Sequence, residues 1–393
     1  MSGLDLRDAV IAGVGEADPV RRSGRTAEQL ALQAIAAAIA DAGLSPGDID
    51  CIVTEGSLCP AMTPTDRIAP AAGIVNLRRV AQSSPIGAGI LAALGMACEM
   101  VASGAASHVL TYFAVDWGTF PAGPVEYHTK MQAKAIVEEP VGFAGPPLYF
   151  AVAAQRYKQV YGLSDEALHA MLADIVIATR ANASLHPAAQ ARQTLDAVSY
   201  QANPMIAEPL RAADCSLLSD GAGAIVVSRR SLWRAQRPDV GLKSWSYAVD
   251  PIPDVDFYTQ SPWLPQLPAT SRASAAALAA AGLTPAEIDM FQIYDCFSIA
   301  IALQLEAIGR AAPGCTKDLV AGGATRHDGA LPVNTHGGLL SHGYVLGIGH
   351  AVEAIRQLRG EAGARQVAGA KNAFVGAGPG RQYTSLILER RDG

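Results

Sequence analysis

The sequence has little charge, few aromatic residues and no long apolar run. Only 17% of its 393 residues are charged, 6% are aromatic, and the formal net charge is −6. No apolar run approaches the roughly 20 residues that a membrane-spanning helix needs. An acidic chain also lacks the basic surface that binds nucleic acid or anionic lipid. We therefore expect neither a membrane nor a nucleic acid as a partner.

Closely spaced cysteine pairs are absent as well. The six cysteines are scattered and no Cys-x-x-Cys occurs, which predicts buried, small apolar side chains in a reducing compartment. The first eight residues lack the basic and apolar regions of a secretion signal, so we expect a cytoplasmic location. The cysteines are Cys51, Cys59, Cys98, Cys215, Cys296 and Cys315.

A repeated segment is the most informative feature that is present. Residues 42–50 read Ala-Gly-Leu-Ser-Pro-Gly-Asp-Ile-Asp, and residues 281–289 read Ala-Gly-Leu-Thr-Pro-Ala-Glu-Ile-Asp. Each copy follows an alanine-rich helical stretch and precedes an apolar strand-like run. Glycine ends the helix and the Ser/Thr-Pro pair starts a new turn. Two copies half a chain apart predict a duplicated α/β unit, and a chance match in an alanine-rich chain is the alternative.

Other segments follow α/β order. Strands are predicted at Asp8–Gly15, Ser107–Val115, Ala222–Ser228 and Tyr383–Leu388, and a helix at Gly87–Gly104. Apolar strands alternating with helices are typical of a sheet that is covered on both faces. Residues from about 116 to 213 differ, because proline-rich pieces precede their helices. We predict an inserted loop domain there, over the functional site.

The ordered motifs resemble the thiolase superfamily, in the branch of the sterol-carrier-protein thiolases and the bacterial lipid-transfer thiolase-like proteins. The resemblance runs nearly end to end. It implies a duplicated thiolase fold, five-layered αβαβα, with halves at residues 1–230 and 231–393. The motifs are Gly13-Val-Gly-Glu, the two Ala-Gly-Leu turns, Pro209-Leu-Arg-Ala-Ala-Asp-Cys-Ser-Leu-Leu-Ser-Asp-Gly, Tyr294-Asp-Cys-Phe, Asn334-Thr-His-Gly-Gly-Leu-Leu-Ser-His-Gly-Tyr and Glu353-Ala-Ile-Arg-Gln-Leu-Arg-Gly.

The chain departs from thiolase chemistry at the family's catalytic positions. The nucleophilic cysteine position falls on Ser84, and the glycine loop Gly376-Ala-Gly-Pro-Gly lacks the second cysteine. Tyr344 takes the place of the histidine in the Gly-His-Pro motif, and Tyr294 that of the histidine in His-Asp-Cys-Phe. A serine hydroxyl stays protonated near neutral pH and needs a paired base to act as a nucleophile. We therefore interpret Ser84 as a polar residue lining the substrate site or a helix cap.

An aldol cleavage needs no stored acyl group and so no thiolate. It needs a base for the 3-hydroxyl group and donors for the oxygen of the thioester enolate. Tyrosine is a neutral donor with a reference pKa of about 10. We expect Tyr294 and Tyr344 to be catalytic, Asp295 to orient Tyr294, and Tyr247 to be a third site tyrosine or a core aromatic.

Two further glycines complete the expected site. Gly343 and Gly378 belong to the motif positions that line the substrate in the family, and we assign them to substrate binding with Ser84. His342 and His350 flank the turn but match non-catalytic positions, so we expect solvent contact or local hydrogen bonding. Cys296 is expected to be structural.

The pattern also resembles thiolase-superfamily aldolases that cleave steroid side chains held as CoA thioesters. That resemblance implies a bulky 3-hydroxyacyl-CoA substrate, a ketone product and a short acyl-CoA such as propanoyl-CoA. It implies no cofactor in this chain. It also implies a small partner with an OB-fold and a zinc ribbon, free or fused to a hydratase, around a homodimer of this chain, with the zinc in the partner.

Two other functions remain open from the sequence. The first is an acyltransferase or 3-oxoacyl-CoA thiolase that uses Ser84 as its nucleophile. The second is a catalytically silent subunit that binds lipid or acyl-CoA, or that scaffolds a partner. The two tyrosines disfavour a silent site, because such a site need not keep hydrogen-bonding groups at both positions.

Overall fold

The computed structural model describes residues 4–84, 87–120, 136, 138–143, 145–250, 264–378 and 380–391. The strands are β1 (Ala9–Val20), β2 (Cys51–Thr54), β3 (Arg79–Gln82), β4 (His108–Asp116), β5 (Met205–Ala207), β6 (Leu210–Arg211), β7 (Asp220–Arg229), β8 (Asp239–Val249), β9 (Met290–Ile293), β10 (Asn372–Ala377) and β11 (Gln382–Arg391). The α-helices are α1 (Ala27–Asp41), α2 (Leu58–Met62), α3 (Thr65–Ala71), α4 (Gly89–Ala102), α6 (Pro146–Tyr161), α7 (Asp165–Ser184), α8 (Ala197–Gln201), α9 (Pro268–Ala281), α10 (Ser298–Ala307), α11 (Thr316–Val320) and α12 (Gly347–Arg359).

Two mixed sheets repeat one strand order. The first sheet runs β1-β7-β4-β2-β3 and the second runs β8-β11-β10-β9. In both, the first three strands pair antiparallel and the next pair is parallel. A fifth strand is reduced in the second sheet to a single parallel bridge between Phe291 and Val333. Each half of the chain therefore builds the same sheet.

The repeated turn has the same geometry in both halves. Gly43 and Gly282 have φ of +69° and +67°, the left-handed conformation that ends a helix at glycine. A short 3-10 turn follows each of them, closed by Ser45 with Asp48 and by Thr284 with Glu287. The strands β2 and β9 come next. The predicted duplicated unit is confirmed at this turn.

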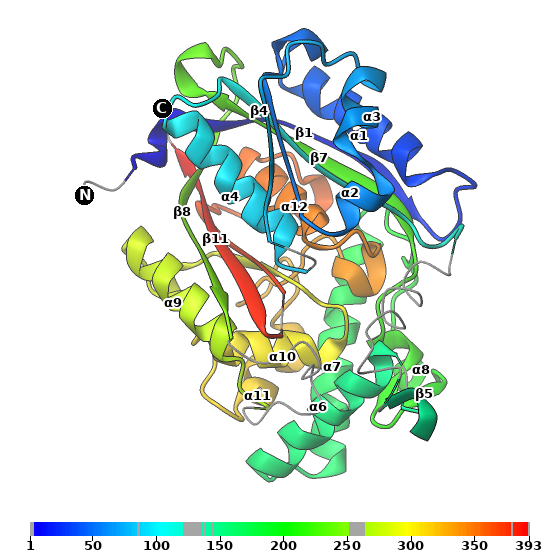
Figure 1. Ribbon diagram of the computed structural model, residues 1–393. Coiled ribbons are helices and arrows are strands. Elements are labelled where there is room, and N and C mark those ends of the chain that lie inside the picture. The colour runs from blue at the N-terminus through cyan, green and yellow to red at the C-terminus, as the bar shows by residue number, and fades with distance from the viewer. Residues whose placement is uncertain are drawn as a thin grey trace.

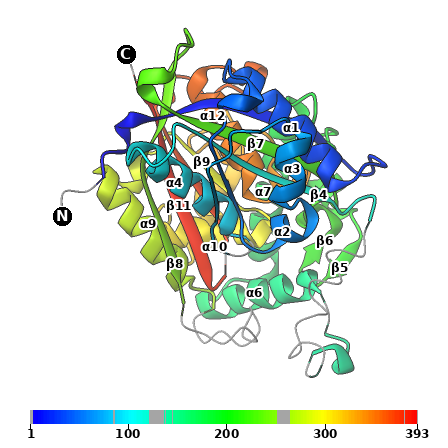
Figure 2. The ribbon, with the colours of Figure 1, turned by 45° about the horizontal axis from the view of Figure 1, so that its top comes forward.

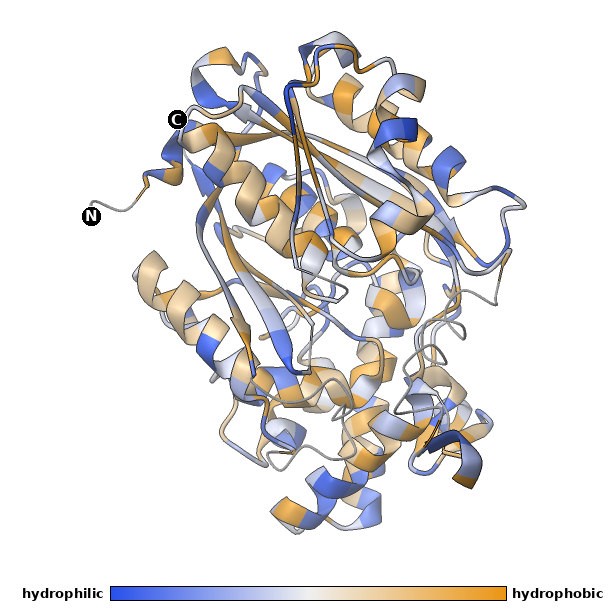
Figure 3. Ribbon diagram, in the orientation of Figure 1, coloured by the Kyte–Doolittle hydropathy of each residue, from blue (hydrophilic) through white to orange (hydrophobic). Residues whose placement is uncertain are grey.

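The buried helices α4 and α12 lie between the two sheets, while α1 and α9 cover their outer faces (Figures 1 and 2). Figure 3 colours α4 as hydrophobic over most of its length, in keeping with its ten buried residues. A Cβ on Gly95 of α4 would overlap the indole ring of Trp245 in β8, so glycine lets the second sheet come close. In the described ranges, no helix is both long and apolar enough to cross a bilayer.

Two element boundaries differ from the sequence prediction. Strand β1 continues past Gly15 to Val20, because its pairing with β7 resumes beyond a register shift between Ala17 and Val20. The alanine-rich stretch before the second repeat copy was expected to be helical from Arg272, and helix α9 begins four residues earlier at Pro268, since proline suits the first turn of a helix. The sequence patterns located the central residues of β1 and α9 but missed the end of the strand and the start of the helix.

The helices α6, α7 and α8 fall within the predicted loop region and lie beside the second half in Figure 1. Helix α7 packs against residues Gly338–His342, a π-helical turn that we call the π-turn. The Arg180 guanidinium of α7 donates to the Ser341 hydroxyl at 3.0 Å. This region therefore supports a segment that carries predicted site residues. Of its prolines, Pro121 and Pro124 lie outside the described residues.

The six cysteines are all free thiols. Cys51, Cys59, Cys98 and Cys296 are buried as predicted, and burial raises the pKa of the Cys51 thiol to about 11. Cys315 is exposed, which differs from the prediction, because it lies in the turn before α11. The buried thiols behave as small core side chains.

Glycines in β1 set the distance to α1, and this generates a first prediction. A Cβ on Gly15 would overlap the carbonyl oxygen of Ala34, whereas one on Gly47 meets nothing closer than 3.7 Å. Gly15→Ala should lower the free energy of unfolding by about 1–3 kcal/mol, the usual cost of overpacking. Gly47→Ala should change it by less than about 0.5 kcal/mol. Urea midpoints measure both, and equal midpoints would contradict the close approach.

Candidate active site

Tyr294 and Tyr344 meet through their hydroxyl groups. The two oxygens are 2.8 Å apart, and either can donate. Tyr294 follows β9 and is 6% exposed, while Tyr344 follows the π-turn and is partly buried. The Tyr344 ring lies against Trp117, with ring centres 5.3 Å apart. Two residues 50 positions apart, both predicted to be catalytic, thus meet at one place in the fold.

The backbone of Tyr294 is fixed on both sides. Its N–H donates to the carbonyl of Gly376 in β10 at 3.0 Å, and its carbonyl accepts from the Gln304 amide of α10 at 2.7 Å. The Asn334 side chain both accepts from the N–H and donates to the carbonyl of the preceding Ile293, each at 2.8 Å. Tyr294 therefore leaves β9 in a defined direction.

The backbone of Tyr344 is held by residues from the first half of the chain. Its N–H donates to the Ser219 hydroxyl at 2.8 Å, and the same hydroxyl accepts from the Gln190 amide at 2.6 Å. The backbone N–H groups of Gln190 and Ala191 donate to carbonyls of the π-turn at 3.2 and 2.9 Å. Ser219 and Gln190 were not predicted. Ser219 belongs to the long motif after Pro209, which was the only signal for it.

Asp295 is buried but does not bond to Tyr294. Its carboxylate accepts from the N–H groups of Leu339 at 2.8 Å and Leu340 at 3.4 Å, and it lies 3.1 Å from Nε2 of His350. Direct orientation of Tyr294 is therefore corrected to support of the π-turn. A Cβ on Gly338 would overlap this carboxylate, and the residue has φ +59°, so only glycine fits there.

Ser84 and Gly378 lie on adjoining loops at the start of α4. A Cβ on Gly87 would be 3.5 Å from Cα of Gly378, and one on Gly378 would be 2.9 Å from Cβ of Ala88. The Ser84 hydroxyl is buried and has no hydrogen-bond partner among the described residues. The structure thus places the segment that follows Ser84 beside Gly378, and within the described residues no base bonds to the serine.

Gly343 and Tyr247 lie in other surroundings. A Cβ on Gly343 would overlap the ring of Pro19, so this glycine serves close packing with β1 and its assignment to substrate binding is corrected. Tyr247 is 37% exposed and donates to the Gln382 side chain at 2.8 Å. Among the described residues, no recorded contact joins Tyr247 to the tyrosine pair.

Four buried histidines lie behind the Tyr344 turn and form what we call the histidine row. Ring centres are 4.5 Å apart for His186 and His342, and 5.1 Å apart both for His342 with His336 and for His336 with His350. The expected local hydrogen bonding is confirmed for His350. Solvent contact is wrong for His342, which is 1% exposed and has no hydrogen-bond partner among the described residues.

Burial sets the charge of the histidine row. It lowers the pKa of His336 and His342 well below the ordinary value and that of His186 to about 4. Neighbouring imidazoles and Arg365 act in the same direction. These three rings are therefore neutral at physiological pH. The sequence signal was three histidines within fifteen positions, His336 to His350, and the fourth is 150 residues away.

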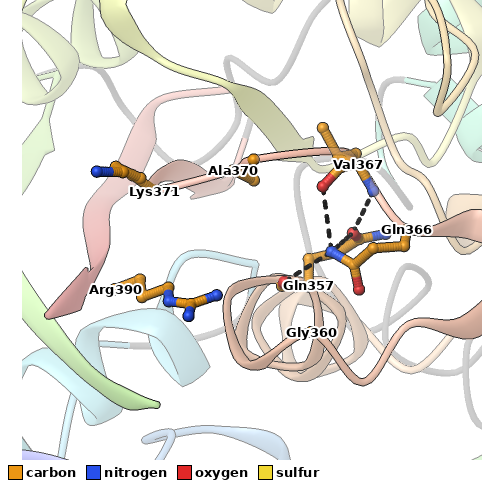
Figure 4. A pocket seen from close by; sticks show the side chains of 8 residues that line it. Gln357, Gly360, Gln366, Val367, Ala370, Lys371 and Arg390 are labelled. Atoms are coloured by element: carbon orange, nitrogen blue, oxygen red, sulfur yellow. Dashed lines mark hydrogen bonds between the residues drawn. The ribbon is translucent and has the colours of Figure 1, made fainter. Parts of the chain in front are cut away.

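A cavity of about 280 Å³ lies at the far end of α12 (Figure 4). Its lining includes Lys371 and Arg390, and Gln357 and Gln366 hydrogen-bond to each other across it. No predicted site residue lines this cavity. It is separate from the tyrosine pair and holds no group that the predicted chemistry requires.

Comparisons with known proteins agree on one family. Residues 257–390 match the family model described as thiolase C-terminal domain-like. The chain is 33% identical to the 17-hydroxy-3-oxo-4-pregnene-20-carboxyl-CoA lyase of Mycobacterium tuberculosis, over 97% of this chain and 98% of that protein. It is 32% identical to the steroid side-chain-cleaving aldolase of Thermomonospora curvata, over 97% of each. Both relatives span nearly the full length.

A solved structure supports the same relation. The structure described as the Ltp2-ChsH2(DUF35) aldolase superposes with a TM-score of 0.88 at 29% identity, over 99% of both chains. An alignment that leaves out so little covers both sheets and the helices between them.

The neutral histidines predict acid sensitivity. A histidine whose folded pKa lies below its unfolded value binds its proton first in the unfolded chain, so stability is complete above about pH 6.5 and falls as the pH drops. Each such group contributes a slope of up to about 1.4 kcal/mol per pH unit. His342→Met should reduce the slope of unfolding free energy between pH 6.5 and 5 by about that amount.

Urea unfolding across this pH range measures the effect. The buried Val352→Ala variant loses core packing without losing a titrating group, so it should be less stable with the wild-type slope. A His342→Met slope equal to that of the wild type would show that the ring is charged in the folded protein.

Proposed function

Because the chain belongs to the thiolase superfamily, in the sterol-carrier-protein and lipid-transfer branch with the steroid side-chain-cleaving aldolases, we propose that it cleaves a bulky steroidal 3-hydroxyacyl-CoA by a retro-aldol reaction. The chain is a carbon–carbon lyase of that superfamily. The observation that carries the proposed site is the 2.8 Å contact between the hydroxyls of Tyr294 and Tyr344. The products are a ring ketone and a short acyl-CoA such as propanoyl-CoA.

The proposed step moves one proton and breaks one bond. A base accepts the proton of the 3-hydroxyl, whose oxygen becomes the ketone carbonyl as the bond between the α and β carbons breaks. The electron pair of that bond forms the thioester enolate, which takes a proton at its α carbon to give the acyl-CoA. The hydroxyls of Tyr294 and Tyr344 are held 2.8 Å apart. We propose that this pair donates a hydrogen bond to the thioester oxygen of the bound substrate.

The start of α4 supports the same chemistry. The first N–H groups of a helix lack partners within it and give that end a partial positive charge. Ser84 and Gly378 lie at this end of α4. We propose that they bound the thioester group, whose oxygen gains negative charge in the reaction. We place Asp295 behind the site as a support of the π-turn, and Tyr247 stays a predicted third site tyrosine.

The geometry disfavours a covalent route. A serine nucleophile needs a base within hydrogen-bonding distance, and the Ser84 hydroxyl has none among the described residues. The acyltransferase alternative therefore lacks its central contact. A silent scaffold would not require a pair of bonded hydroxyls at this position.

The tyrosine hydroxyls should account for most of the rate. Tyr344→Phe and Tyr294→Phe should each lower kcat by about 10²–10³-fold, the usual cost of removing one donor to a developing oxyanion. Ser84→Ala should change kcat by less than about threefold, because the serine stores no acyl group. Release of ketone and acyl-CoA from a steroidal 3-hydroxyacyl-CoA measures each rate.

Tyr112→Phe is the matched control. Tyr112 is fully buried and donates to the carbonyl of Thr63 at 2.8 Å, so its loss should affect stability and leave kcat unchanged. Loss of all turnover in Ser84→Ala alone, or an acyl group trapped on Ser84, would refute the non-covalent route.

The finer architecture is part of the proposal. We propose five layers, αβαβα, with halves at residues 1–230 and 231–393 and an inserted loop domain at about 116–213. The repeated strand order and the helices α6 to α8 support this division.

A partner with an OB-fold and a zinc ribbon, which would hold the zinc, is supported by the two-component name of the Ltp2-ChsH2(DUF35) relative. The cytoplasm remains the proposed location.

A homodimer through β3 is proposed from its open edge. β3 is the last strand of its sheet, and Val80 is 51% exposed. The N–H groups of Arg79 and Ser83 donate to carbonyls at β2, so the N–H of Val80 between them points away from that sheet. An unpaired strand edge of this kind pairs readily with a second copy.

Val80→Pro tests the edge without touching the pairing to β2. Proline removes only the outward N–H, so the folded chain should sediment as a monomer while the wild type sediments as a dimer. Val75→Ala, at an exposed side chain outside the strand, should leave the dimer intact. A dimeric, folded Val80→Pro protein would place the interface elsewhere.

A further inference from the structure

In the described part of the chain, the histidine row is bonded to the support of the tyrosine site through His350. His350 is fully buried on α12, and its Nε2 lies 3.1 Å from Oδ1 of Asp295. Asp295 in turn holds the first N–H groups of the π-turn, and Tyr344 is the second residue after that turn. A continuous chain of contacts therefore runs from His350 to the backbone that carries Tyr344.

The direction of the hydrogen bond follows from the partners. Asp295 already accepts from the N–H groups of Leu339 and Leu340, as a carboxylate does. A carboxylate has no proton to give, so Nε2 of His350 must carry the hydrogen. Its Nδ1 has no hydrogen-bond partner among the described residues, which leaves a single useful contact on this ring.

The surroundings explain why a histidine suits this place. The charged groups near the row include Asp295 from the strand side, Arg192 after α7, and Glu353, Arg356 and Arg365 on and after α12. The Arg365 guanidinium is bonded to Glu353 at 2.8 Å, so that pair is satisfied internally. In the described part of the chain, no set of three or more His, Cys, Asp or Glu side chains is arranged to hold a metal ion. The row is therefore a packed, largely neutral support.

We propose that His350 is a positioning residue: by donating to Asp295 it fixes the carboxylate that anchors the π-turn and so places the hydroxyl of Tyr344 against that of Tyr294. This inference rests on the proposed aldol cleavage for its kinetic consequence. It assigns His350 no contact with the substrate. Loss of its N–H lets the Asp295 carboxylate rotate, which weakens the anchor of the π-turn and misplaces the tyrosine that acts in the transition state.

Three variants separate the N–H from the bulk of the ring. His350→Met keeps an apolar side chain of similar length and removes the donor, and His350→Gln restores an N–H at a similar distance from the backbone. We expect His350→Met to lower kcat about 10–100-fold with KM changed less than threefold. Where that loss exceeds tenfold, the kcat of His350→Gln should be at least tenfold higher than that of His350→Met. The asparagine side chain in His350→Asn is too short to reach Asp295, so this variant should behave as His350→Met. It replaces His350→Met in the test if that variant does not fold.

His186→Met is the matched control. His186 ends the same row, is also buried and touches His342 but not Asp295. Its substitution should cost comparable stability with kcat within about twofold of the wild type. A His186→Met loss as large as that of His350→Met would overturn the proposal, as would a His350→Gln variant no better than His350→Met.

A double-mutant cycle and amide exchange complete the test. The double variant Asp295→Asn, His350→Met should have a kcat no lower than that of Asp295→Asn alone, because both substitutions remove the same anchor of the π-turn. If the losses of kcat in the two single variants multiply in the double variant, the proposal is overturned. Hydrogen exchange at Leu339 and Leu340 should be at least tenfold faster in His350→Met and unchanged in His186→Met. This readout needs no turnover, so a wild-type protein without aldolase activity would refute the proposed function and leave His350 testable.

Discussion

The contact between the Tyr294 and Tyr344 hydroxyls constrains the whole molecule. A hydrogen bond of 2.8 Å tolerates only small errors in the two backbones that carry it. One backbone leaves the second sheet at β9, and the other leaves the π-turn, which Gln190 and Ser219 of the first half hold in place. Neither half of the chain could place the pair alone. The duplicated architecture thus supplies the precision that two phenols need.

Loss of the thiolase cysteine is compatible with this arrangement because the chemistry changes at one step only. Thiolysis and aldol cleavage both pass through a thioester enolate, so the donors and the helix end that stabilise its oxygen serve either reaction. Only thiolysis must store an acyl group. A serine at the start of α4 keeps the local backbone and removes the nucleophile, and in the proposed reaction the two phenols serve as donors to the enolate oxygen.

The sequence predicted what depends on short patterns. The repeated turn, the strand cores and the two tyrosines at matched positions were all readable from local order. Asp295 was misjudged because adjacency in sequence is not adjacency in space: neighbours on extended backbone point to opposite sides. Tyr294 and Asp295 follow a strand, so their side chains diverge, one to the site and one to the π-turn. Gly343 and the distant His186 depend on packing partners that no local pattern names.

The histidine row behind the Tyr344 turn is largely neutral, and this favours phenols over charged donors at the site. A cationic imidazolium beside the thioester would stabilise the enolate more strongly than a phenol, but it would place a buried charge next to the histidine row. Such a charge is costly without a paired anion, and the Asp295 carboxylate is already engaged by the π-turn. Neutral donors avoid that cost. The tyrosines therefore fit their support as well as their chemistry.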